Sequence, residues 1–468
     1  MHEAEHLIAG AWTRGAVART MTVFNSADGT PVTRIAVASE TDVMDAVKAA
    51  HGAAPGWART APAHRAAALR AAADTLEAAT DELAEIMSAE IGKPVNEAAA
   101  SIAAGVGTLC QYAELGPAHR GRALAGNDEA IDLMAYGPRG VVAVITPWND
   151  PVAVSCGLLG GALVTGNAVV YKPSERAPAT GCRLAQLLAP HFPAGVFSML
   201  SGDGSVGALI ADADVDVVAH VGSTAAGRTI AAACARTGAK ALLENGGNDP
   251  LIVDTGVDPA WAARQAALGA FANSGQMCTS VERIYLHRDI AEPFLDTLVA
   301  EAHRWAANLG PLVDTRLREA VHAQVSAAVR AGARVLAGGV VPAGPGAYYP
   351  PTVLADCTDA MAVVRRETFG PVAPVVPVES FREALSRAAD SPYGLAATVL
   401  THSMSHAQRA WRELAVGTVK VNAVFGGAPG GAAQPRRGSG DGFGYGPELL
   451  DEMTVMKAVH LEAPPAGW

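Results

Sequence analysis

The sequence has few cysteines, and none lies in a metal-binding arrangement. The 468 residues include six scattered cysteines, with no CxxC pair and no Cys/His cluster at metal-ligand spacing. This pattern argues against a zinc site, so we expect no metal. Sparse cysteine is typical of a reducing compartment, and the run Met1-His-Glu-Ala-Glu-His6 lacks the basic start and apolar core of a signal peptide. We therefore expect a cytoplasmic protein.

Clusters of positive charge and long apolar runs are missing as well. The formal net charge is −11, and no run of lysines and arginines stands out. Because phosphate binding needs clustered basic residues, we expect no nucleic-acid partner. The longest apolar stretches, such as residues 210–221, are interrupted by Asp and His. No membrane span is therefore expected.

What the chain does have is enough apolar residues for large cores. Half of its residues are hydrophobic and only 17% are charged, and this length predicts two or three domains. Residues 40–115 are rich in alanine, with recurrent Leu, Glu and Arg. Within them, apolar residues recur at helical spacing, which predicts a helical layer; they include Leu69, Ala73, Leu76, Leu83 and Met87.

After Gly140, short apolar runs alternate with helical stretches. This alternation predicts parallel strands with covering helices, with strands at 141–145, 168–171, 196–200, 215–218 and 241–243. A second α/β series begins after Gly247, with strands at 250–253 and 283–286 around a helix near 261–273. The Gly/Pro-rich segment 426–446 predicts a loop, and 453–460 predicts a late strand with an exposed edge. The fold class is therefore α/β.

Cys278, in Asn273-Ser-Gly-Gln-Met-Cys278-Thr279, is the most informative residue. A cysteine in an apolar protein is usually buried and inert, and a nucleophilic thiol needs a setting that favours the thiolate. Glu244, in Leu243-Glu244-Asn245-Gly246-Gly247, lies 34 positions earlier. This carboxylate can supply the base that a thiol nucleophile needs.

Four more motifs occur in a characteristic order: Thr146-Pro-Trp148-Asn149, Lys172-Pro-Ser-Glu175, Gly222-Ser223 and Glu367-Thr-Phe369-Gly-Pro371. With the Glu244 and Cys278 segments, they make the chain resemble NAD(P)-dependent aldehyde dehydrogenases almost end to end. The resemblance implies two Rossmann-like parallel-sheet domains, an NAD-binding domain (1–118 and 139–244) and a catalytic domain (245–444). It also implies a small β element (119–138 and 445–468) that bridges the subunits of a homodimer or homotetramer.

The resemblance assigns catalytic roles to three residues. Cys278 attacks an aldehyde, and Asn149 donates to the resulting oxyanion beside the backbone N–H of Cys278. After hydride leaves, Glu244 activates water against the thioester. Because acylating relatives characteristically lack this acid, its presence favours hydrolysis to the free acid over transfer to coenzyme A.

The resemblance also implies the cofactor contacts. Glu175 accepts from both ribose hydroxyls and repels a 2′-phosphate, which favours NAD, whereas Lys172 leaves NADP possible. Gly222-Ser223 opens a helix whose amides suit the pyrophosphate, although His220-Val221 replaces the usual Phe-Thr before it. Glu367 and Phe369 hold the nicotinamide ribose and ring. The complete set is Ile145, Thr146, Pro147, Trp148, Lys172, Ser174, Glu175, Gly202, Gly222, Ser223, Glu367 and Phe369.

A competing phosphate-loop pattern occurs at Gly202-Asp-Gly204-Ser-Val-Gly207, which satisfies GxGxxG after an apparent strand. Gly222, and no acid, stands 20 residues after Gly202, where a dinucleotide fingerprint requires Asp or Glu. We therefore interpret the pattern as a tight strand-to-helix turn and expect the pyrophosphate elsewhere.

Several positions depart from the family pattern. Asp150 replaces an aromatic residue of the substrate tunnel; it would favour a polar or cationic aldehyde, or else it caps a helix or faces solvent. Met277 and Thr279 are expected to touch the first carbons of the substrate. The loop 423–431 lacks the usual aromatic, which suggests a more open mouth. Gly444 stands where many relatives carry an acid, and Asn245, in place of a common Leu, either hydrogen-bonds in the cleft or makes a turn.

Together these features predict NAD-dependent oxidation of an aldehyde to the carboxylic acid through a cysteine thiohemiacetal and thioester. A coenzyme A-acylating or NADP-preferring semialdehyde dehydrogenase is one alternative. The other is an inactive cofactor-binding or structural relative. The joint presence of Cys278, Glu244 and Asn149 argues against inactivity.

Overall fold

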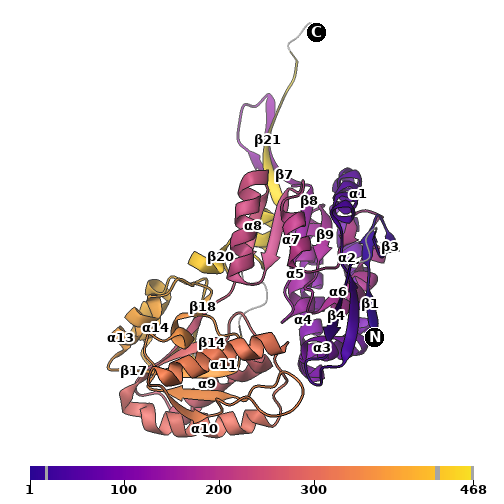
Figure 1. Ribbon diagram of the computed structural model, residues 1–468. Coiled ribbons are helices and arrows are strands. Elements are labelled where there is room, and N and C mark those ends of the chain that lie inside the picture. Colours follow the sequence, from indigo (N-terminus) through magenta and orange to yellow (C-terminus); the bar gives the residue numbers. More distant parts are fainter. Residues whose placement is uncertain (16–18, 427–432, 465–468) are drawn as a thin grey trace.

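Two large sheets, each with helices on both faces, make up the two halves of the molecule (Figure 1). The computed structural model describes residues 1–15, 19–426 and 433–464. The α/β fold class is therefore confirmed, although the exact domain boundaries stay a prediction. Within the described residues, no helix is both long and apolar enough to cross a bilayer.

The first sheet has eight strands in the order β20-β12-β11-β8-β9-β10-β2-β3. Its five central strands are parallel, whereas β20, β2 and β3 run antiparallel to their neighbours. All five central strands overlap the predicted segments, although β11 begins two residues later and ends three residues later than the predicted 215–218. The bounds are β2 (His6–Ile8), β3 (Ala11–Thr13), β8 (Val141–Ile145), β9 (Ala168–Lys172), β10 (Phe197–Met199), β11 (Val217–Val221), β12 (Lys240–Glu244) and β20 (Gly440–Asp441).

Helices cover both faces of this sheet because side chains along each strand alternate between faces. Val142 and Val144 pack with helices α2 to α6, whereas Val141 and Ala143 pack with α1, α7 and α8. The predicted helical layer is confirmed, with its five named apolar residues buried. The bounds are α1 (Glu40–Arg59), α2 (Pro62–Ala78), α3 (Thr80–Ile91), α4 (Val95–Ala118), α5 (Pro151–Val164), α6 (Pro178–Leu188), α7 (Gly204–Ala211) and α8 (Thr224–Thr237).

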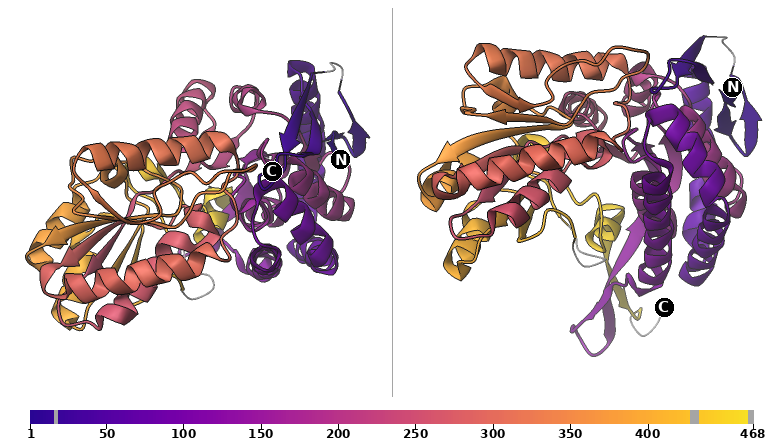
Figure 2. Two further views of the ribbon diagram at one scale, coloured as in Figure 1. Left: turned by 60° about the horizontal axis from the view of Figure 1, so that its bottom comes forward. Right: turned by 90° about the horizontal axis from the view of Figure 1, so that it is seen from below.

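The second sheet has seven strands in the order β15-β16-β17-β14-β13-β18-β19, all parallel except β15. Figure 2 shows helices above and below it. The strands are β13 (Asp249–Val253), β14 (Val281–His287), β15 (Arg334–Ala337), β16 (Thr352–Ala355), β17 (Val372–Val378), β18 (Ala396–Leu400) and β19 (Thr418–Val421). The helices are α9 (Pro259–Phe271), α10 (Ala291–Ala306), α11 (Thr315–Arg330), α12 (Ala362–Arg365), α13 (Phe381–Ala389) and α14 (Met404–Glu413).

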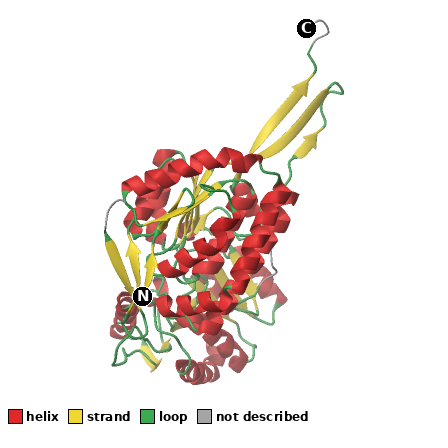
Figure 3. Cartoon of the chain, turned by 90° about the vertical axis from the view of Figure 1, so that its right-hand side faces the viewer, coloured by secondary structure: helices red, strands yellow, loops and turns green. Residues whose placement is uncertain are grey.

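A small three-stranded sheet extends from the body of the molecule (Figure 3). It pairs β21 (Thr454–Glu462) with β7 (Ala130–Pro138), which in turn pairs with β6 (Arg122–Leu124). The expected late strand is therefore present, and it lies at a sheet edge after the short helix α15 (Glu448–Glu452). The bridging of subunits by this element stays a prediction.

Two features of the chain were not anticipated. Before residue 40, the chain forms the first sheet's β2 and β3 and a separate sheet of β1 (His2–Ala4), β5 (Pro31–Ala36) and β4 (Thr20–Phe24). The predicted loop 426–446 contains the short helix η4 (Arg437–Ser439) and β20, which pairs with β12; its residues 427–432 lie outside the described part. A two-residue strand has no periodicity to reveal it, because only its pairing with β12 defines it.

Candidate active site

The carboxyl ends of the first sheet's strands open into a cleft between the two halves of the molecule. Parallel strands end at the same sheet edge, which is where open α/β sheets bind ligands. Two connected cavities occupy the cleft, one of about 480 Å³ and one of about 610 Å³. They share Pro147 and Trp148 after β8, Gly222 and Ser223 after β11, and Arg176. The motifs of the first half therefore converge on one cleft.

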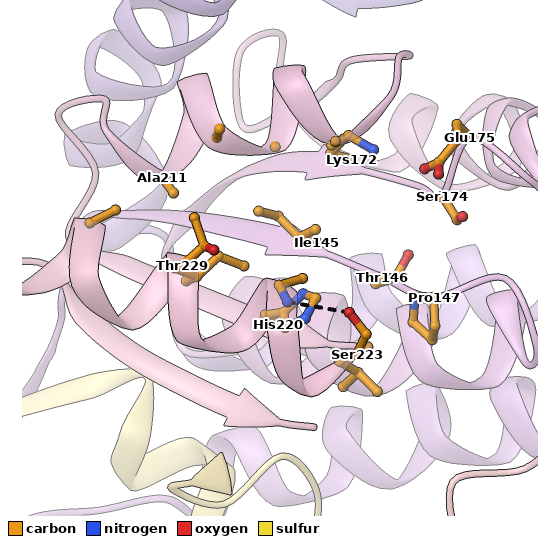
Figure 4. A pocket seen from close by; sticks show the side chains of 18 of the residues that line it. Ile145, Thr146, Pro147, Lys172, Ser174, Glu175, Ala211, His220, Ser223 and Thr229 are labelled. Atoms are coloured by element: carbon orange, nitrogen blue, oxygen red, sulfur yellow. Dashed lines mark hydrogen bonds between the residues drawn. The ribbon is translucent and has the colours of Figure 1, made fainter. Parts of the chain in front are cut away.

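The smaller cavity carries polar groups along its walls. Figure 4 shows Lys172, Ser174 and Glu175 on one side, with His220 and Ser223 on the other. Lys172 is buried, its Nζ donates to the carbonyl of Pro173 at 3.0 Å, and burial lowers its pKa. Ser223 caps α8, because its side chain accepts from the N–H of Ala226 at 3.2 Å.

Small residues keep the smaller cavity open. α7 contributes Gly204, Gly207 and Ala208, and α8 contributes Ala226 and Ala233. An apolar slot suits a flat base, a carboxylate suits ribose hydroxyls, and a helix N-terminus suits phosphate. The residues therefore fit a dinucleotide. The cavity lining includes Ile145, Thr146, Pro147, Trp148, Lys172, Ser174, Glu175, Gly222 and Ser223 from the expected set.

His220, which replaces a usual Phe of the family, is a packed side chain. It is buried, and burial lowers its pKa to about 4, so the ring is neutral. A Cβ at Gly222 would lie 2.6 Å from the His220 Cε1. Only glycine fits above this ring.

Gly202 lines neither cavity, although Gly204 of the same motif lines the smaller one. Its φ is +144°, and a Cβ there would lie 2.4 Å from Val206 Cγ2, so glycine is needed for a close turn. The next residue, Asp203, caps α7 by accepting from the N–H of Ser205 at 3.0 Å. The interpretation as a strand-to-helix turn is confirmed, and a cofactor contact from Gly202 itself stays a prediction.

The larger cavity joins the three expected catalytic side chains. Cys278 Sγ lies 4.0 Å from Glu244 Oε1, and both side chains line this cavity with Asn149. The Asn149 Nδ2 donates to the carbonyl of Gln276 at 3.0 Å. The end of β12, the loop after β8 and the loop before β14 therefore meet at one point.

The loop that presents Cys278 is strained. Asn273, Ser274 and Gly275 have φ values of 48°, 56° and 71°, a run of left-handed residues that costs free energy unless its surroundings hold it. The amide of Gln276 anchors the loop through two hydrogen bonds. Its Nε2 donates to the Asn273 carbonyl within the loop at 3.2 Å, and its Oε1 accepts from the N–H of Val313, on a neighbouring segment, at 2.9 Å. Strain stored in this way is typical of a functional site.

The environment of Cys278 favours the thiol over the thiolate. Burial raises its pKa well above the ordinary value, and the negative charge of Glu244 raises it further. Burial also raises the pKa of Glu244. A nucleophilic cysteine needs a setting that favours the thiolate. The structure differs because the sulfur is buried and because carboxylates from distant segments, Glu244 first among them, disfavour a negative charge on it.

This environment predicts a slow reaction of Cys278 with iodoacetamide at neutral pH. Only the thiolate is alkylated, so a raised pKa moves the increase in rate to higher pH, well above the ordinary thiol value of about 8.5. The measurement is the second-order alkylation rate against pH, with Cys278→Ala as the blank for the other cysteines. A plateau below pH 8 would contradict the prediction.

Glu367 and Phe369 line the larger cavity opposite the first sheet. Glu367 accepts from the N–H of Gly247 at 3.2 Å. The buried Glu282 accepts from the N–H groups of Thr368 and Phe369, each at 2.8 Å, and so fixes Phe369 at its positive φ of 55°. Burial and the nearby charge of Glu367 raise the pKa of Glu282.

An aromatic contact connects the two halves of the cleft. The Phe369 ring meets Trp148 edge-on at 5.5 Å between centroids. The Arg176 guanidinium lies over the Trp148 ring, at 5.5 Å from its centroid. It also forms an ion pair with Asp314 at 3.2 Å. The sequence did not single out Arg176 or Glu282, because their roles depend on contacts with distant segments.

The expected substrate contacts also line the larger cavity. Met277 and Thr279 flank Cys278 there, and Asp150 lies in the same wall. Asp150 is at the N-cap position of α5 but makes no side-chain cap bond. Its carboxylate instead pairs with Lys93 Nζ at 3.5 Å and accepts from Ser101. Lys93 and Ser101 were missed; their only signal was polarity within an alanine-rich helical layer.

Two of the departures have a local explanation. Asn245 is buried, and its Nδ2 donates to the carbonyl of Gly438 at 3.2 Å, which ties β12 to the segment before β20. A Cβ at Gly444 would lie 2.8 Å from Glu244 Oε2, so the absence of the usual acid leaves room for this carboxylate. The mouth loop 423–431 lies partly outside the described residues.

In the ranges that the structure describes, no group of three or more His, Cys, Asp or Glu side chains is placed to hold a metal ion.

The model of the aldehyde dehydrogenase family matches residues 12–459. An indole-3-acetaldehyde dehydrogenase solved in complex with NAD⁺ has 33% identity and a TM-score of 0.95, covering 99% of this chain and 97% of that one.

Two further solved structures are similar over almost their full lengths. The NAD-dependent aldehyde dehydrogenase from Sinorhizobium meliloti has 32% identity and a TM-score of 0.95, covering 100% of this chain and 96% of its own. The lactaldehyde dehydrogenase from Escherichia coli has 31% identity and a TM-score of 0.95, covering 98% and 99%. With the motifs gathered in one cleft, these matches show that the chain belongs to the aldehyde dehydrogenase family.

Proposed function

We propose that the protein oxidises an aldehyde to the free carboxylic acid, with NAD as the cofactor and Cys278 as the nucleophile. The observation that carries the proposal is the 4.0 Å separation of Cys278 Sγ and Glu244 Oε1 in a cavity that also contains Asn149. This cavity adjoins a second one that fits a dinucleotide.

Cys278 begins the reaction by forming a bond from sulfur to the aldehyde carbon. The thiol proton leaves as the bond forms, and Glu244, whose Oε1 lies 4.0 Å from the sulfur, accepts it. The carbonyl oxygen becomes an alkoxide, for which the Asn149 amide is the side-chain donor. The product is a thiohemiacetal on Cys278.

Glu244 then acts on the oxidised intermediate. When bound, NAD supplies the hydride acceptor that converts the thiohemiacetal to a thioester. Once Glu244 has passed the thiol proton to solvent, it takes a proton from water and the oxygen attacks the thioester carbon. The bond to sulfur then breaks to release the acid, and Glu244 returns its proton to the sulfur. Burial raises the pKa of this carboxyl, which favours its gain of a proton from the thiol and from water.

Glu175 supports NAD as the preferred cofactor. Its carboxylate lines the smaller cavity beside Lys172 and Ser174, where it would accept from two ribose hydroxyls and repel a 2′-phosphate. The related indole-3-acetaldehyde dehydrogenase was solved with NAD⁺. The buried ammonium of Lys172 leaves NADP as a weaker alternative.

We expect the purified protein to form NADH and free acid in equal amounts from an aldehyde and NAD. Coenzyme A should leave the product unchanged, because Glu244 directs water to the thioester. Product analysis by mass spectrometry, with and without coenzyme A, and kcat/KM for NAD and NADP test the proposal. Formation of an acyl-coenzyme A would support the acylating alternative, and no NADH with any aldehyde would support the inactive one.

We also propose that the small sheet β6-β7-β21 joins subunits of a homodimer or homotetramer. Its edge strand β21 is open to pairing. Leu461 of β21 lies opposite Ile131 of β7, and these apolar residues are 54% and 61% exposed. A sedimentation mass equal to one chain of 47.7 kDa would contradict the proposal.

A further inference from the structure

We infer that Lys93, Ser101 and Asp150 form a hydroxyl-binding subsite, which selects short, uncharged aldehydes with a hydroxyl group near the carbonyl. The inference rests on the proposed aldehyde oxidation and names the substrate class of the same site. The subsite lies in the wall of the larger cavity, where all three residues are found together with Cys278 and Asn149.

Asp150 is positioned to receive a donor from the cavity. The Lys93 ammonium and the Ser101 hydroxyl both contact Oδ1, so Oδ2 is the oxygen with no hydrogen-bond donor from the described part of the chain. The side chain is 36% exposed. Since its carboxylate does not cap α5, it is available for a ligand in the cavity.

Lys93 supplies the complementary donor. Its side chain is only 8% exposed, and Asp150 is the one hydrogen-bond acceptor that its ammonium contacts within the described residues. An ammonium has three hydrogens, which leaves further donors beside the free carboxylate oxygen. A hydroxyl both donates and accepts one hydrogen bond, so it satisfies both neighbours at once.

The balance of charge favours a neutral ligand. The Lys93 ammonium contacts Asp150 at 3.5 Å and its charge also acts on Glu97, whose carboxyl accepts from the backbone of Asn273. An anionic substrate would be repelled by both Asp150 and Glu97, and a cationic one would be repelled by Lys93 and would compete with it for Asp150. A neutral hydroxyl avoids both effects and leaves the ion pair intact.

The position of Asp150 limits where the hydroxyl lies on the substrate. Asp150 directly follows Asn149, and consecutive Cα atoms are about 3.8 Å apart. Because the Asn149 amide is the proposed donor to the carbonyl oxygen, the subsite adjoins the reacting carbon. The hydroxyl is therefore placed on the second or third carbon of the aldehyde.

The test compares pairs of aldehydes that differ only in the hydroxyl: glycolaldehyde with acetaldehyde, and lactaldehyde with propionaldehyde. For the wild type we expect kcat/KM to be at least about tenfold higher for each hydroxyaldehyde, the size of effect that a hydrogen bond to a charged group gives. In Lys93→Met and Asp150→Ala the ratio should fall to within about threefold of one.

The ratio is informative because both members of a pair share any disturbance of Asn149. Lys48→Met removes the same charge from an exposed site on α1 and should leave the ratio unchanged. Lys93→Met keeps the test decisive if Asp150→Ala fails to fold, since Lys93 lies on a separate segment before α4.

Three results with the short aldehydes would overturn the inference while leaving the proposed function in place. These are a wild-type ratio within twofold of one, a ratio that survives both substitutions, or a higher kcat/KM for 3-aminopropionaldehyde than for 3-hydroxypropionaldehyde. If hexanal or benzaldehyde is oxidised while none of the short aldehydes is, the subsite fails and the proposed function stands. If no aldehyde reduces NAD, the proposed function fails and the subsite fails with it.

Discussion

Replacement of Cys278 by alanine is expected to lower kcat for aldehyde oxidation by about 10⁴-fold or more, the scale of losses when a covalent nucleophile is removed. Without the sulfur no thiohemiacetal forms, and Asn149 and Glu244 have no adduct to act on. The dissociation constant for NAD should change less than about threefold, because the Cys278 side chain does not line the smaller cavity. Steady-state NADH formation and calorimetric titration with NAD measure the two quantities.

Cys110→Ala is the matched control for loss of a thiol. Cys110 is partly buried on α4 and lines neither cavity, so this variant should keep the wild-type rate. A Cys278→Ala variant that keeps even a few per cent of the wild-type kcat would remove covalent catalysis from the proposal. Loss of NAD binding in the same variant would instead indicate a disturbed fold.

Replacement of Glu244 by glutamine is expected to lower steady-state kcat by about 10²- to 10⁴-fold, the range for loss of a general base. Glutamine keeps the shape of the side chain, but it takes no proton from water. The thioester should therefore accumulate. Rapid mixing should show a burst of one NADH per active site, followed by slow turnover, and intact-mass spectrometry should find the acyl group on Cys278.

The burst separates the two roles that the structure allows for Glu244. At 4.0 Å from the sulfur, its carboxylate can accept the thiol proton as well as a proton from water. An abolished burst would assign its main role to the first step, because no thioester would form. An unchanged steady-state rate would contradict both roles. Gly444→Ala is a second variant that disturbs Glu244 without replacing it, because the added Cβ would lie only 2.8 Å from Glu244 Oε2.

The sequence predicted the elements of the first sheet well because each buried parallel strand is a short continuous apolar run. The run at 141–145 coincides with β8, and the segment 168–171 matches β9 except for its last residue. The early strands β2 and β3 and the short β20 were missed. They are only two or three residues long, and strands of that length are defined by their partners and not by a local pattern.

In the candidate site too, features that lie in local motifs were predicted, and features that depend on contacts between distant segments were not. Cys278, Glu244 and Asn149 were identified because each lies in a distinctive motif. The pKa of Cys278 was not predictable, since it depends on burial and on carboxylates that come from other segments. Lys93 pairs with a residue 57 positions away, and no local pattern in an alanine-rich segment indicates such a pair. Gly202 makes the predicted strand-to-helix turn but does not line the smaller cavity, although Gly204 of the same GxGxxG pattern does.

The amino-acid sequence by itself determined the family, the alternation of strands and helices between Gly140 and Glu244, and the chemical groups available for catalysis. These follow from local patterns, in which apolar periodicity and short motifs lie within one segment of the chain. Only the tertiary structure decided that burial and the charge of Glu244 raise the pKa of the Cys278 thiol, that Asp150 pairs with Lys93 and Ser101, and that Gly444 leaves room for Glu244. Burial, charge and contact distance arise between segments that are distant in sequence, so they exist only once the chain has folded.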